Sequence, residues 1–370
     1  MVSSTPVDRA RVLVLIKGLG IGGAERLIAE GAQHWDRTAI DYRVAYFLPW
    51  KNQLVDEIRA MGIAVDCLGS DRGLGLTAFR KLRSLISEWQ PDLIHSHLPT
   101  AGILARLATA RPVVYTEHNI ASSYRQPTRL VNRLTYGRNA AVIAVSDAVA
   151  ESLVGFPGVP PRVIPNGVSV SVSASEIESV RAELGMQPGQ SLVAHVGNIR
   201  PHKGHENLIA ATALLVAKDP NVLVVSVGAE KHDGDLARVR SSAHAAGVSE
   251  HIRFMGRREN ARSFLAAADV VVNPADVEGL PLAILEGLAL SRPVVATAVG
   301  GVPAVVLDRV TGLLVPPGDP EALSVGLLEA LESPDAKGWG QAGAALVSAE
   351  YGIARMIADY EKLYREVLHA

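Results

Sequence analysis

The sequence predicts an α/β fold with two doubly wound domains, each built on a parallel β-sheet with helices on both faces. Short apolar runs alternate with helical patterns along the chain, and these runs are continuous in Val, Ile and Leu rather than strictly alternating. Such runs are typical of strands that are buried on both faces. A length of 370 residues exceeds one ordinary core and suits two domains.

The predicted strands form two series, and each series predicts one sheet. The first series comprises residues 11–16, 41–47, 64–67, 93–95, 113–116 and 141–145. The second comprises residues 192–196, 222–227, 252–254, 270–272 and 293–296. Between them, a proline-rich stretch ending at Pro165 and the Ser-rich residues 169–175 indicate a domain boundary.

The end of the chain predicts an amphipathic helix. Its apolar residues recur at three- and four-residue spacing, which places them in one stripe: Ile353, Met356, Ile357, Tyr360, Leu363, Tyr364 and Val367.

The composition excludes several classes of protein. A net charge of -2 argues against a dedicated nucleic-acid binder. The single cysteine, Cys67, cannot form an internal disulfide and fits a reducing cytoplasm. We see no targeting segment and no apolar stretch of the roughly 20 residues that a spanning helix needs. We therefore expect a soluble protein that at most lies on a membrane surface.

A glycine-rich turn follows the first predicted strand. Gly18, Gly20 and Gly23 have the spacing of a dinucleotide-binding turn, in which backbone N–H groups and a helix N-terminus approach a phosphate. That pattern also needs an acidic residue at the end of the second strand, whereas Asp41 begins it. The turn is therefore either close to a phosphate or merely tight.

The loop after the first strand of the second series carries two cations. Arg200 and Lys203 lie in residues 196–204, which connect that strand to a helix. Ligands of doubly wound folds bind at this edge of the sheet. Fixed cations there can stabilise a departing diphosphate without a metal ion. The alternative interpretation is a solvated charged loop.

The most specific segment is residues 276–286. Gly279 and Pro281 open a predicted helix whose first N–H groups can bind phosphate oxygens. Glu278 precedes this helix, and we expect Glu286 about two turns inside it. A carboxylate there can accept hydrogen bonds from a ribose diol. A solvated helix face would explain Glu286 alone but not the whole turn.

In this order along the chain, the motifs resemble those of glycosyltransferase family 4. They are Gly22-Gly23-Ala24-Glu25, His95-Ser96-His97, Thr116-Glu117-His118, Val145-Ser146, Pro165-Asn166-Gly167-Val168, Lys203-Gly204, residues 278–286, Val299-Gly300-Gly301-Val302-Pro303 and residues 312–319. The family is a large retaining group with the GT-B fold, in which two Rossmann-like domains face each other across a cleft. The resemblance covers nearly the whole chain.

The resemblance implies roles for particular residues. Glu278 would contact donor-sugar hydroxyls, Glu286 the nucleotide ribose and Lys203 the diphosphate. Catalytic roles are expected for His118, Glu278 and Lys203. Donor binding is expected for Gly22, Gly23, Arg200, Lys203, Gly256, Arg257, Glu278, Gly279, Leu280, Pro281 and Glu286.

The resemblance also implies a domain scheme and an activity. Residues 1–168 would form the domain on the acceptor side, 169–350 the domain on the nucleotide-sugar side, and 351–370 a helix that returns to the first domain, with a hinge at residues 165–168. The enzyme would be a hexosyltransferase-type, retaining glycosyltransferase that needs no metal ion or cofactor. It would act on a glycan or lipid-linked acceptor in the cytoplasm or at the inner face of the membrane, in cell-surface polysaccharide or glycolipid synthesis.

One position departs from the family pattern. Many members have arginine directly after the glycine that matches Gly197, and this arginine pairs with the lysine on the diphosphate. Here the residue is Asn198, and whether Arg200 compensates for it stays open. An NAD(P)-dependent oxidoreductase and a catalytically inactive nucleotide-sugar-binding protein are the alternatives; the first is favoured by the glycine spacing and the second by Asn198.

For the other polar patterns we do not predict a catalytic role. Asp233-Gly234-Asp235 has the spacing of a metal-binding pair but predicts a solvated turn. His95 and His97 are expected to be cleft or structural histidines. Basic residues concentrate at Arg72, Arg80, Lys81 and Arg83, and again at Arg125, Arg129, Arg133 and Arg138. These segments either dock on an anionic membrane or lipid-linked acceptor or form ordinary solvated helix faces.

Overall fold

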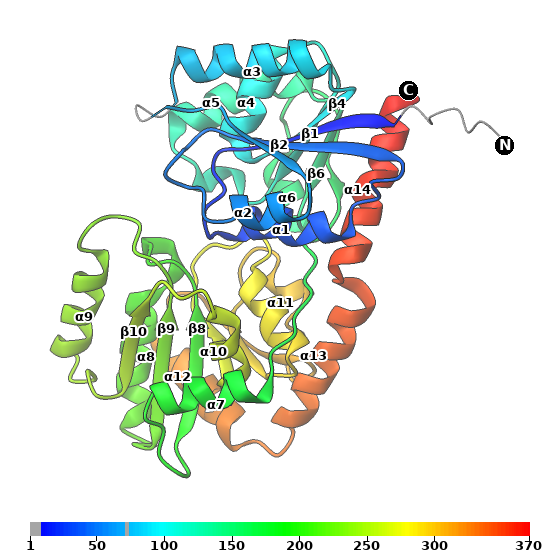
Figure 1. Ribbon diagram of the computed structural model, residues 1–370. Coiled ribbons are helices and arrows are strands. Elements are labelled where there is room, and N and C mark those ends of the chain that lie inside the picture. The colour runs from blue at the N-terminus through cyan, green and yellow to red at the C-terminus, as the bar shows by residue number, and fades with distance from the viewer. Residues whose placement is uncertain (1–8, 71–73) are drawn as a thin grey trace. The chain divides into compact units, whose positions relative to one another are not determined.

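The computed structural model describes residues 9–70 and 74–370. Contacts within the chain divide it into two compact units (Figure 1). The first unit comprises Met1–Gly167 and Ile353–Ala370, and the second comprises Val168–Gly352. The chain thus leaves the first unit once and returns to it with its last helix. No helix in the described ranges is long and apolar enough to cross a membrane.

The first unit is built on a seven-stranded parallel sheet with the order β3-β2-β1-β4-β5-β6-β7. The strands are β1 (Ala10–Ile16), β2 (Ile40–Tyr46), β3 (Ala64–Cys67), β4 (Leu93–His97), β5 (Val113–Glu117), β6 (Ala141–Ala144) and β7 (Arg162–Val163). The strand order reverses between β1 and β4, which pair directly. Ligands of doubly wound sheets bind beside the carboxyl ends of the strands at such a reversal.

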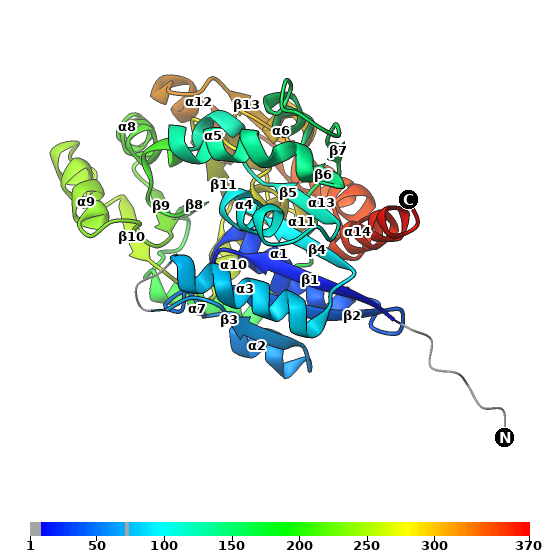
Figure 2. The same ribbon diagram turned by 90° about the horizontal axis from the view of Figure 1, so that it is seen from above.

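Helices cover both faces of this sheet. They are α1 (Gly23–Gly31), α2 (Val55–Ala60), α3 (Leu76–Trp89), α4 (Leu98–Ala108), α5 (Gln126–Thr135), α6 (Asp147–Ser152) and α14 (Ile353–Leu368). α3, α4 and α5 lie side by side in this order (Figure 2). The apolar faces of α3 and α4 form a core with β1 and β4 that includes Leu13, Leu82 and Ile94.

α14 packs against α1 within the first unit. The predicted stripe of apolar residues is buried from Ile353 to Tyr364. Glu361 is buried with them, because its carboxylate accepts hydrogen bonds from the Tyr42 hydroxyl at 2.8 Å and from the Asp36 backbone N–H at 2.8 Å. The side chain of Ile357 approaches Gly31 so closely that a Cβ there would displace it.

The second unit is built on a six-stranded parallel sheet with the order β10-β9-β8-β11-β12-β13. Its strands are β8 (Ser191–Val196), β9 (Val222–Val227), β10 (Ile252–Gly256), β11 (Val270–Asn273), β12 (Val294–Thr297) and β13 (Gly312–Val315). Its helices are α7 (Ala174–Glu183), α8 (His205–Val216), α9 (Asp235–Ala245), α10 (Ala261–Ala267), α11 (Leu282–Ala289), α12 (Pro320–Glu332) and α13 (Ala336–Glu350). Here the strand order reverses between β8 and β11.

The predicted α/β class with two Rossmann-like sheets is confirmed. Each predicted strand corresponds to an observed one, with ends that differ by at most two residues. Two strands were not predicted. β7 has only two residues, both exposed, and therefore has no apolar run. β13 begins with Gly312, whose missing side chain lets the chain approach Val294 closely.

Candidate active site

Two loops of the second unit meet at the carboxyl ends of β8 and β11. The loop after β8 contains a short 3₁₀ turn, Pro201–Lys203, and ends at Gly204. The backbone N–H of Asp276, in the loop after β11, donates to the carbonyl oxygen of His202 at 2.9 Å. Gly204 has φ 69°, and a Cβ there would overlap the carbonyl oxygen of Pro274. Only glycine permits this approach of the two loops.

The close approach brings two predicted site residues into contact. Lys203 Nζ donates to Glu278 Oε1 at 2.6 Å. Asn273 Nδ2, at the end of β11, donates to the same oxygen at 3.3 Å. The side chains of Lys203 and Glu278 are 22% and 8% exposed. A cation and a carboxylate are thus fixed side by side where the strand order reverses.

The turn that contains Gly279, Leu280 and Pro281 leads into α11. Pro281 is the N-cap of α11, which begins at Leu282. The Pro281 side chain does not cap the helix by accepting a hydrogen bond from its first N–H groups. The backbone N–H of Gly301 donates to the carbonyl oxygen of Gly279 at 2.7 Å, which fixes the turn from the opposite side. Glu286 is therefore little more than one turn inside α11, and the expected depth of two turns is wrong because the helix begins later.

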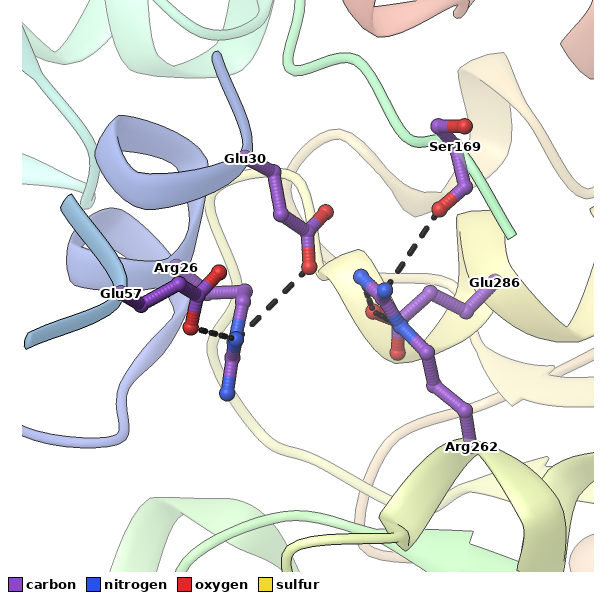
Figure 3. A network of polar contacts seen from close by, with 6 residues as sticks. All are labelled: Arg26, Glu30, Glu57, Ser169, Arg262 and Glu286. Carbon is purple, nitrogen blue, oxygen red and sulfur yellow. Dashed lines mark hydrogen bonds and ion pairs between the residues drawn. The ribbon is translucent and has the colours of Figure 1, made fainter. Parts of the chain in front are cut away.

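Glu286 is paired with an arginine that the sequence did not indicate. Arg262, on α10, donates to Glu286 Oε1 from Nε at 2.8 Å and lies 2.7 Å from it through Nη2. Its Nη1 is 3.5 Å from the carbonyl oxygen of Ser169 (Figure 3). The side chain of Glu286 is 10% exposed, so Arg262 balances the charge of a buried carboxylate.

The remaining predicted donor residues border the same sheet. Asn198 Oδ1 accepts the backbone N–H of Ala229 at 3.1 Å, so this residue joins the loops after β8 and β9. Arg200 Nε is buried and has no hydrogen-bond partner in the described part of the chain. Gly256 ends β10 with φ 65°, and Arg257, which follows it, is exposed. These residues keep their predicted donor roles as expectations.

In the first unit, the glycine-rich turn leads directly into α1. Gly22 is the N-cap and Gly23 is the first residue of the helix. A Cβ at Gly22 would overlap the carboxylate of Glu25, which folds back over the turn. Arg26, one residue further, lies 3.0 Å from Glu57 and 3.8 Å from Glu30 (Figure 3). The Glu25 carboxylate therefore covers this turn on the side of α1.

Gly18 and Gly20 have a packing role in this turn. A Cβ on Gly18 would approach Lys51 Cβ to 2.9 Å, and one on Gly20 would approach Gln53 Oε1 to 3.2 Å. The backbone N–H of Leu19, between them, donates to the carbonyl oxygen of Lys51 at 2.7 Å. The glycine spacing that resembles a dinucleotide-binding turn is thus explained by the tight approach of residues 51–53.

His118 follows β5 and is held by the residue before it. The Glu117 carboxylate accepts the hydroxyls of Tyr115 and Tyr124, each at 2.5 Å. It also accepts the backbone N–H groups of His118 at 3.1 Å and Asn119 at 3.3 Å. Burial raises the pKa of Glu117 to about 7, although each of these hydrogen bonds lowers it.

The ring of His118 contacts a second histidine. His118 Nε2 lies 3.0 Å from His97 Nδ1, at the end of the neighbouring strand β4. Behind them, His95 bonds Tyr364 at 2.6 Å and Thr116 at 2.7 Å. Burial lowers the pKa of His118 to about 4 and that of His95 to about 3, and it lowers the pKa of His97 as well. All three rings are neutral at pH 7.

Comparison with known proteins identifies the family. The family model described as Glycosyl transferases group 1 matches residues 176–361. The one described as Glycosyltransferase Family 4 matches residues 21–172. The chain is a member of glycosyltransferase family 4. The predicted family is thus confirmed, and the oxidoreductase alternative is set aside.

Curated relatives carry glycosyltransferase and synthase names. Alpha-maltose-1-phosphate synthase of Mycolicibacterium smegmatis is 30% identical over 85% of this chain and 94% of its own length. D-inositol 3-phosphate glycosyltransferase of Saccharomonospora viridis is 31% identical over 75% of this chain and 71% of its own length. The match to the Segniliparus rotundus protein of the same name is 30% identical, with 70% of this chain but only 62% of that protein covered.

Solved structures share the fold. Anabaena Alr3699/HepE in complex with UDP and glucose matches with a TM-score of 0.86 and 22% identity, over 97% of this chain and 100% of that one. Sucrose-phosphate synthase from Thermosynechococcus elongatus matches with a TM-score of 0.80 and 20% identity, over 97% and 100%. At sequence identities of 20% and 22%, these structures show that the fold is shared and nothing more.

Arg262, Glu117 and His97 each contact a predicted residue. The sequence did not indicate Arg262, and it gave Glu117 no role of its own. His97 was expected as a cleft or structural histidine, and the structure places it opposite Thr116, two residues before His118. The Asp233-Gly234-Asp235 segment is a turn, in which Asp235 Oδ2 accepts the His232 backbone N–H at 3.0 Å. No group of three or more His, Cys, Asp or Glu residues suited to a metal ion occurs among the described residues.

Proposed function

We propose that this glycosyltransferase moves a hexose from a nucleotide-diphosphate sugar to an acceptor hydroxyl with retention of anomeric configuration. The observation that carries the proposal is the contact of Lys203 with Glu278, 2.6 Å apart at the strand-order reversal of the second unit. A sugar diphosphate needs a cation beside its phosphate groups and, next to it, a group that accepts hydrogen bonds from the sugar hydroxyls. Lys203 provides the first and Glu278 the second.

The donor would lie along the carboxyl edge of this sheet. Lys203 and Arg200 would hold the diphosphate, with the buried, unpartnered Nε of Arg200 compensating for Asn198. Gly279, Leu280 and Pro281 form the turn that leads into α11, and the N-terminus of this helix would offer backbone N–H groups to the phosphate oxygens. Glu278 would accept sugar hydroxyls and Glu286 ribose hydroxyls, and Gly256 and Arg257 would border the base.

The donor base is proposed from a fold relative. Anabaena Alr3699/HepE was solved in complex with UDP-glucose, with a TM-score of 0.86 and 22% identity. We therefore propose a uridine diphosphate sugar as the first donor to test. The transfer itself consists of one exchange of bonds at the anomeric carbon and one proton transfer. The bond from the anomeric carbon to the diphosphate oxygen breaks, a bond to the acceptor oxygen forms on the same face, and the acceptor proton passes to the leaving phosphate.

No carboxylate nucleophile is needed in this scheme. Lys203 and backbone N–H groups would stabilise the negative charge that develops on the diphosphate, which is the largest electrostatic demand of the reaction. His118, neutral at pH 7, would contact the sugar through its ring or carbonyl group, and Gly22 and Gly23 would face the diphosphate. We propose that these groups replace a metal ion.

The acceptor would be a glycan or a lipid-linked molecule used in cell-surface polysaccharide or glycolipid synthesis. α5 supports a lipid-linked acceptor or peripheral contact with the inner face of the membrane. Leu130 and Leu134 on this helix are 58% and 74% exposed, and no Asp or Glu occurs from His118 to Ser146. Arg129 and Arg133 lie on the same helix, whereas Arg72, of the other basic segment, is outside the described residues.

A thermal-shift screen with UDP, GDP, ADP and TDP, each with and without EDTA, tests the donor site. We expect one nucleotide to raise the melting temperature, equally with EDTA, and the shift to disappear in Glu286→Ala. Turnover of the matching nucleotide sugar then distinguishes an enzyme from an inactive sugar-nucleotide-binding protein. A shift with NAD and with none of the four diphosphates would overturn the proposed function.

A further inference from the structure

The pairing of Arg262 with Glu286 is built into the second unit. Nε and Nη2 of the guanidinium both contact Glu286 Oε1, at 2.8 and 2.7 Å. Two N–H groups of one guanidinium on one carboxylate give a charge-assisted contact with a defined direction. Figure 3 shows both side chains extended toward each other from α10 and α11. The guanidinium therefore restricts the position of Glu286 Oε1.

The surroundings of Glu286 make a cation necessary. Its neighbours on α11, Ile284, Leu285, Gly287 and Leu288, are all buried. A carboxylate in such a position is unfavourable unless a cation or several hydrogen bonds accompany it. Arg262, with its side chain 27% exposed, is that cation. Without it, the carboxylate would turn away toward water.

The backbone of Arg262 is fixed as well. The residues that follow it on α10, from Ser263 to Ala267, are all buried. α10 packs against α7, α11 and β8. The carbonyl oxygen of Ser169, 3.5 Å from Nη1, lies on the opposite side of the guanidinium from α10. A side chain anchored at both ends loses little additional entropy when a ligand binds.

We propose that Arg262 is a positioning residue that sets the preference of this enzyme for ribose over deoxyribose in the nucleotide. This inference rests on the proposed function, in which Glu286 accepts the ribose hydroxyls. A carboxylate offers about four acceptor sites, and the guanidinium contacts at 2.8 and 2.7 Å both reach Oε1. The guanidinium holds the carboxylate in place, so that the hydroxyls meet an acceptor that needs no rearrangement. A nucleotide that lacks one hydroxyl leaves this buried acceptor unmatched.

The decisive measurement is the affinity for UDP compared with 2′-deoxy-UDP and 3′-deoxy-UDP, determined by calorimetry in the full chain. If the thermal screen selects GDP or ADP, their deoxy forms replace these probes. We expect the unaltered enzyme to prefer the ribonucleotide by about ten- to a hundredfold over at least one deoxy form, the range for a hydrogen bond to a charged group. No acceptor is needed for this experiment.

Arg262→Met should weaken UDP binding by about tenfold while the affinity for the same deoxynucleotide changes little, so the preference approaches one. Arg262→Lys should retain part of it, because a cation is present but the two-nitrogen contact is lost. Adding Arg262→Met to Glu286→Ala should cause no further loss. Arg262→Lys also serves as the second variant if Arg262→Met does not fold.

Arg181→Met is the matched control. Arg181 donates to the carbonyl oxygen of Ala267 at 2.8 Å and lies 3.1 Å from Asp269 Oδ1, so its loss loosens the end of α10 without touching Glu286. The ribose preference should survive in this variant. Its disappearance would show that any loosening of α10 has the same effect and would overturn the positioning role.

The outcomes separate this inference from the proposed function. Binding of no nucleoside diphosphate by the unaltered enzyme would defeat both. Binding with a ribose preference that Arg262→Met and Arg262→Lys leave intact would defeat only the role of Arg262. Equal losses for UDP and its deoxy forms would do the same, because they would indicate a general effect on the site.

Discussion

Lys203 Nζ lies 2.6 Å from Glu278 Oε1, although the two residues come from different loops and have different predicted partners in the donor. The contact exists because Gly204 lets its loop approach Pro274 and because the His202 carbonyl oxygen accepts the Asp276 N–H. A donor diphosphate would therefore meet a lysine whose charge is already shared with a carboxylate. This sharing limits the charge that binding must desolvate.

Substitution of Lys203 and substitution of Glu278 should affect stability and nucleotide binding differently. Lys203→Met leaves the Glu278 carboxylate buried without its cation, which should lower the free energy of unfolding by about 3–5 kcal/mol and abolish the nucleotide-dependent thermal shift. Glu278→Gln keeps the side-chain shape and a carbonyl acceptor. It should leave UDP affinity within about threefold but remove the extra affinity for UDP-glucose over UDP. Urea unfolding and calorimetry measure these quantities.

Both variants remove the same ion pair, so a comparison of the two tests the separate roles of Lys203 and Glu278. If Lys203→Met bound UDP as tightly as the unaltered enzyme, Lys203 would not be a diphosphate ligand. If Glu278→Gln lost UDP and UDP-glucose binding alike, Glu278 would act on the loop rather than on the sugar.

Gly204→Ala should disturb the approach of the two loops. A Cβ there would overlap the Pro274 carbonyl oxygen, in addition to the cost of φ 69° for an L-residue. Gly185→Ala is the control, because Gly185 has φ 60° and no atom near its Cβ position. We expect Gly185→Ala to cost about 1–2 kcal/mol of stability through φ alone. Gly204→Ala should cost roughly 2 kcal/mol more and weaken UDP binding as well.

Equal stability losses in the two variants, with UDP binding retained in both, would mean that the loops tolerate the added methyl group by moving apart. The measurement is again urea unfolding with UDP titration.

The fold was predictable from the sequence because buried parallel strands are continuous apolar runs. β9, for example, is Val222–Val227 with every residue buried, and its predicted limits are the observed ones. β7 and β13 escaped prediction because one has no buried residue and the other begins with a glycine in close contact. Apolar patterns report burial, so a strand such as β7, whose two residues are exposed, leaves no pattern.

The site was predictable only where its residues lie in continuous motifs. Lys203, Glu278 and Glu286 each belong to one. Arg262 and Glu286 are separated by 24 residues, and an arginine near the start of a helix resembles many solvated ones. Glu117 belongs to a quoted motif, but its role depends on Tyr115 and Tyr124 folding onto it. Contacts between distant residues are set by tertiary packing, which spacing does not encode.

Removal of the apolar side chains of α5 should reduce attachment to anionic membranes. Leu130 and Leu134 are exposed on a helix in which only Asn132 is buried, so Leu130→Ser with Leu134→Ser should leave stability nearly unchanged. We expect the unaltered enzyme to sediment with vesicles that contain anionic lipid, and the double variant to do so several-fold less. Neither the unaltered protein nor the double variant should sediment with neutral vesicles. Equal sedimentation with anionic and neutral vesicles would contradict a role for the arginines.

Acid should unfold the protein through its buried histidines. The pKa of His95 falls from its ordinary 6.5 to about 3 because burial disfavours the charged ring. The unfolded chain therefore binds a proton below pH 6.5 that the folded chain refuses until about pH 3. His95 contributes stability that is complete above pH 6.5 and is lost on acidification at about 1.4 kcal/mol per pH unit. His118, with its pKa lowered to about 4, adds a similar loss.

His95→Gln tests this origin. Glutamine can bond Tyr364 and Thr116 but does not titrate, so the free energy of unfolding should decline less steeply between pH 6.5 and 4.5 by about 1.4 kcal/mol per pH unit. Urea unfolding at half-unit pH intervals gives the slopes. Parallel slopes for the variant and the unaltered protein would show that His95 titrates normally in the folded state.

Glu117 should act in the opposite direction. Burial raises its pKa from 4.5 to about 7, so between these values the folded chain holds a proton that the unfolded chain has released. Stability from this group is present below pH 4.5 and declines as pH rises toward 7, by about 3 kcal/mol in total. Glu117→Gln removes that decline. The difference in unfolding free energy, variant minus unaltered protein, should therefore rise by about 3 kcal/mol from pH 4.5 to 7.

The absolute stability of Glu117→Gln matters less than this pH dependence, because the amide changes how Tyr115 and Tyr124 donate. Tyr124→Phe provides the complementary case. It removes one hydrogen bond that lowers the pKa of Glu117, so the decline of stability should extend above pH 7. A difference curve that is flat between pH 4.5 and 7 for Glu117→Gln would show that Glu117 is ionised throughout, with the tyrosine and backbone donors outweighing its burial.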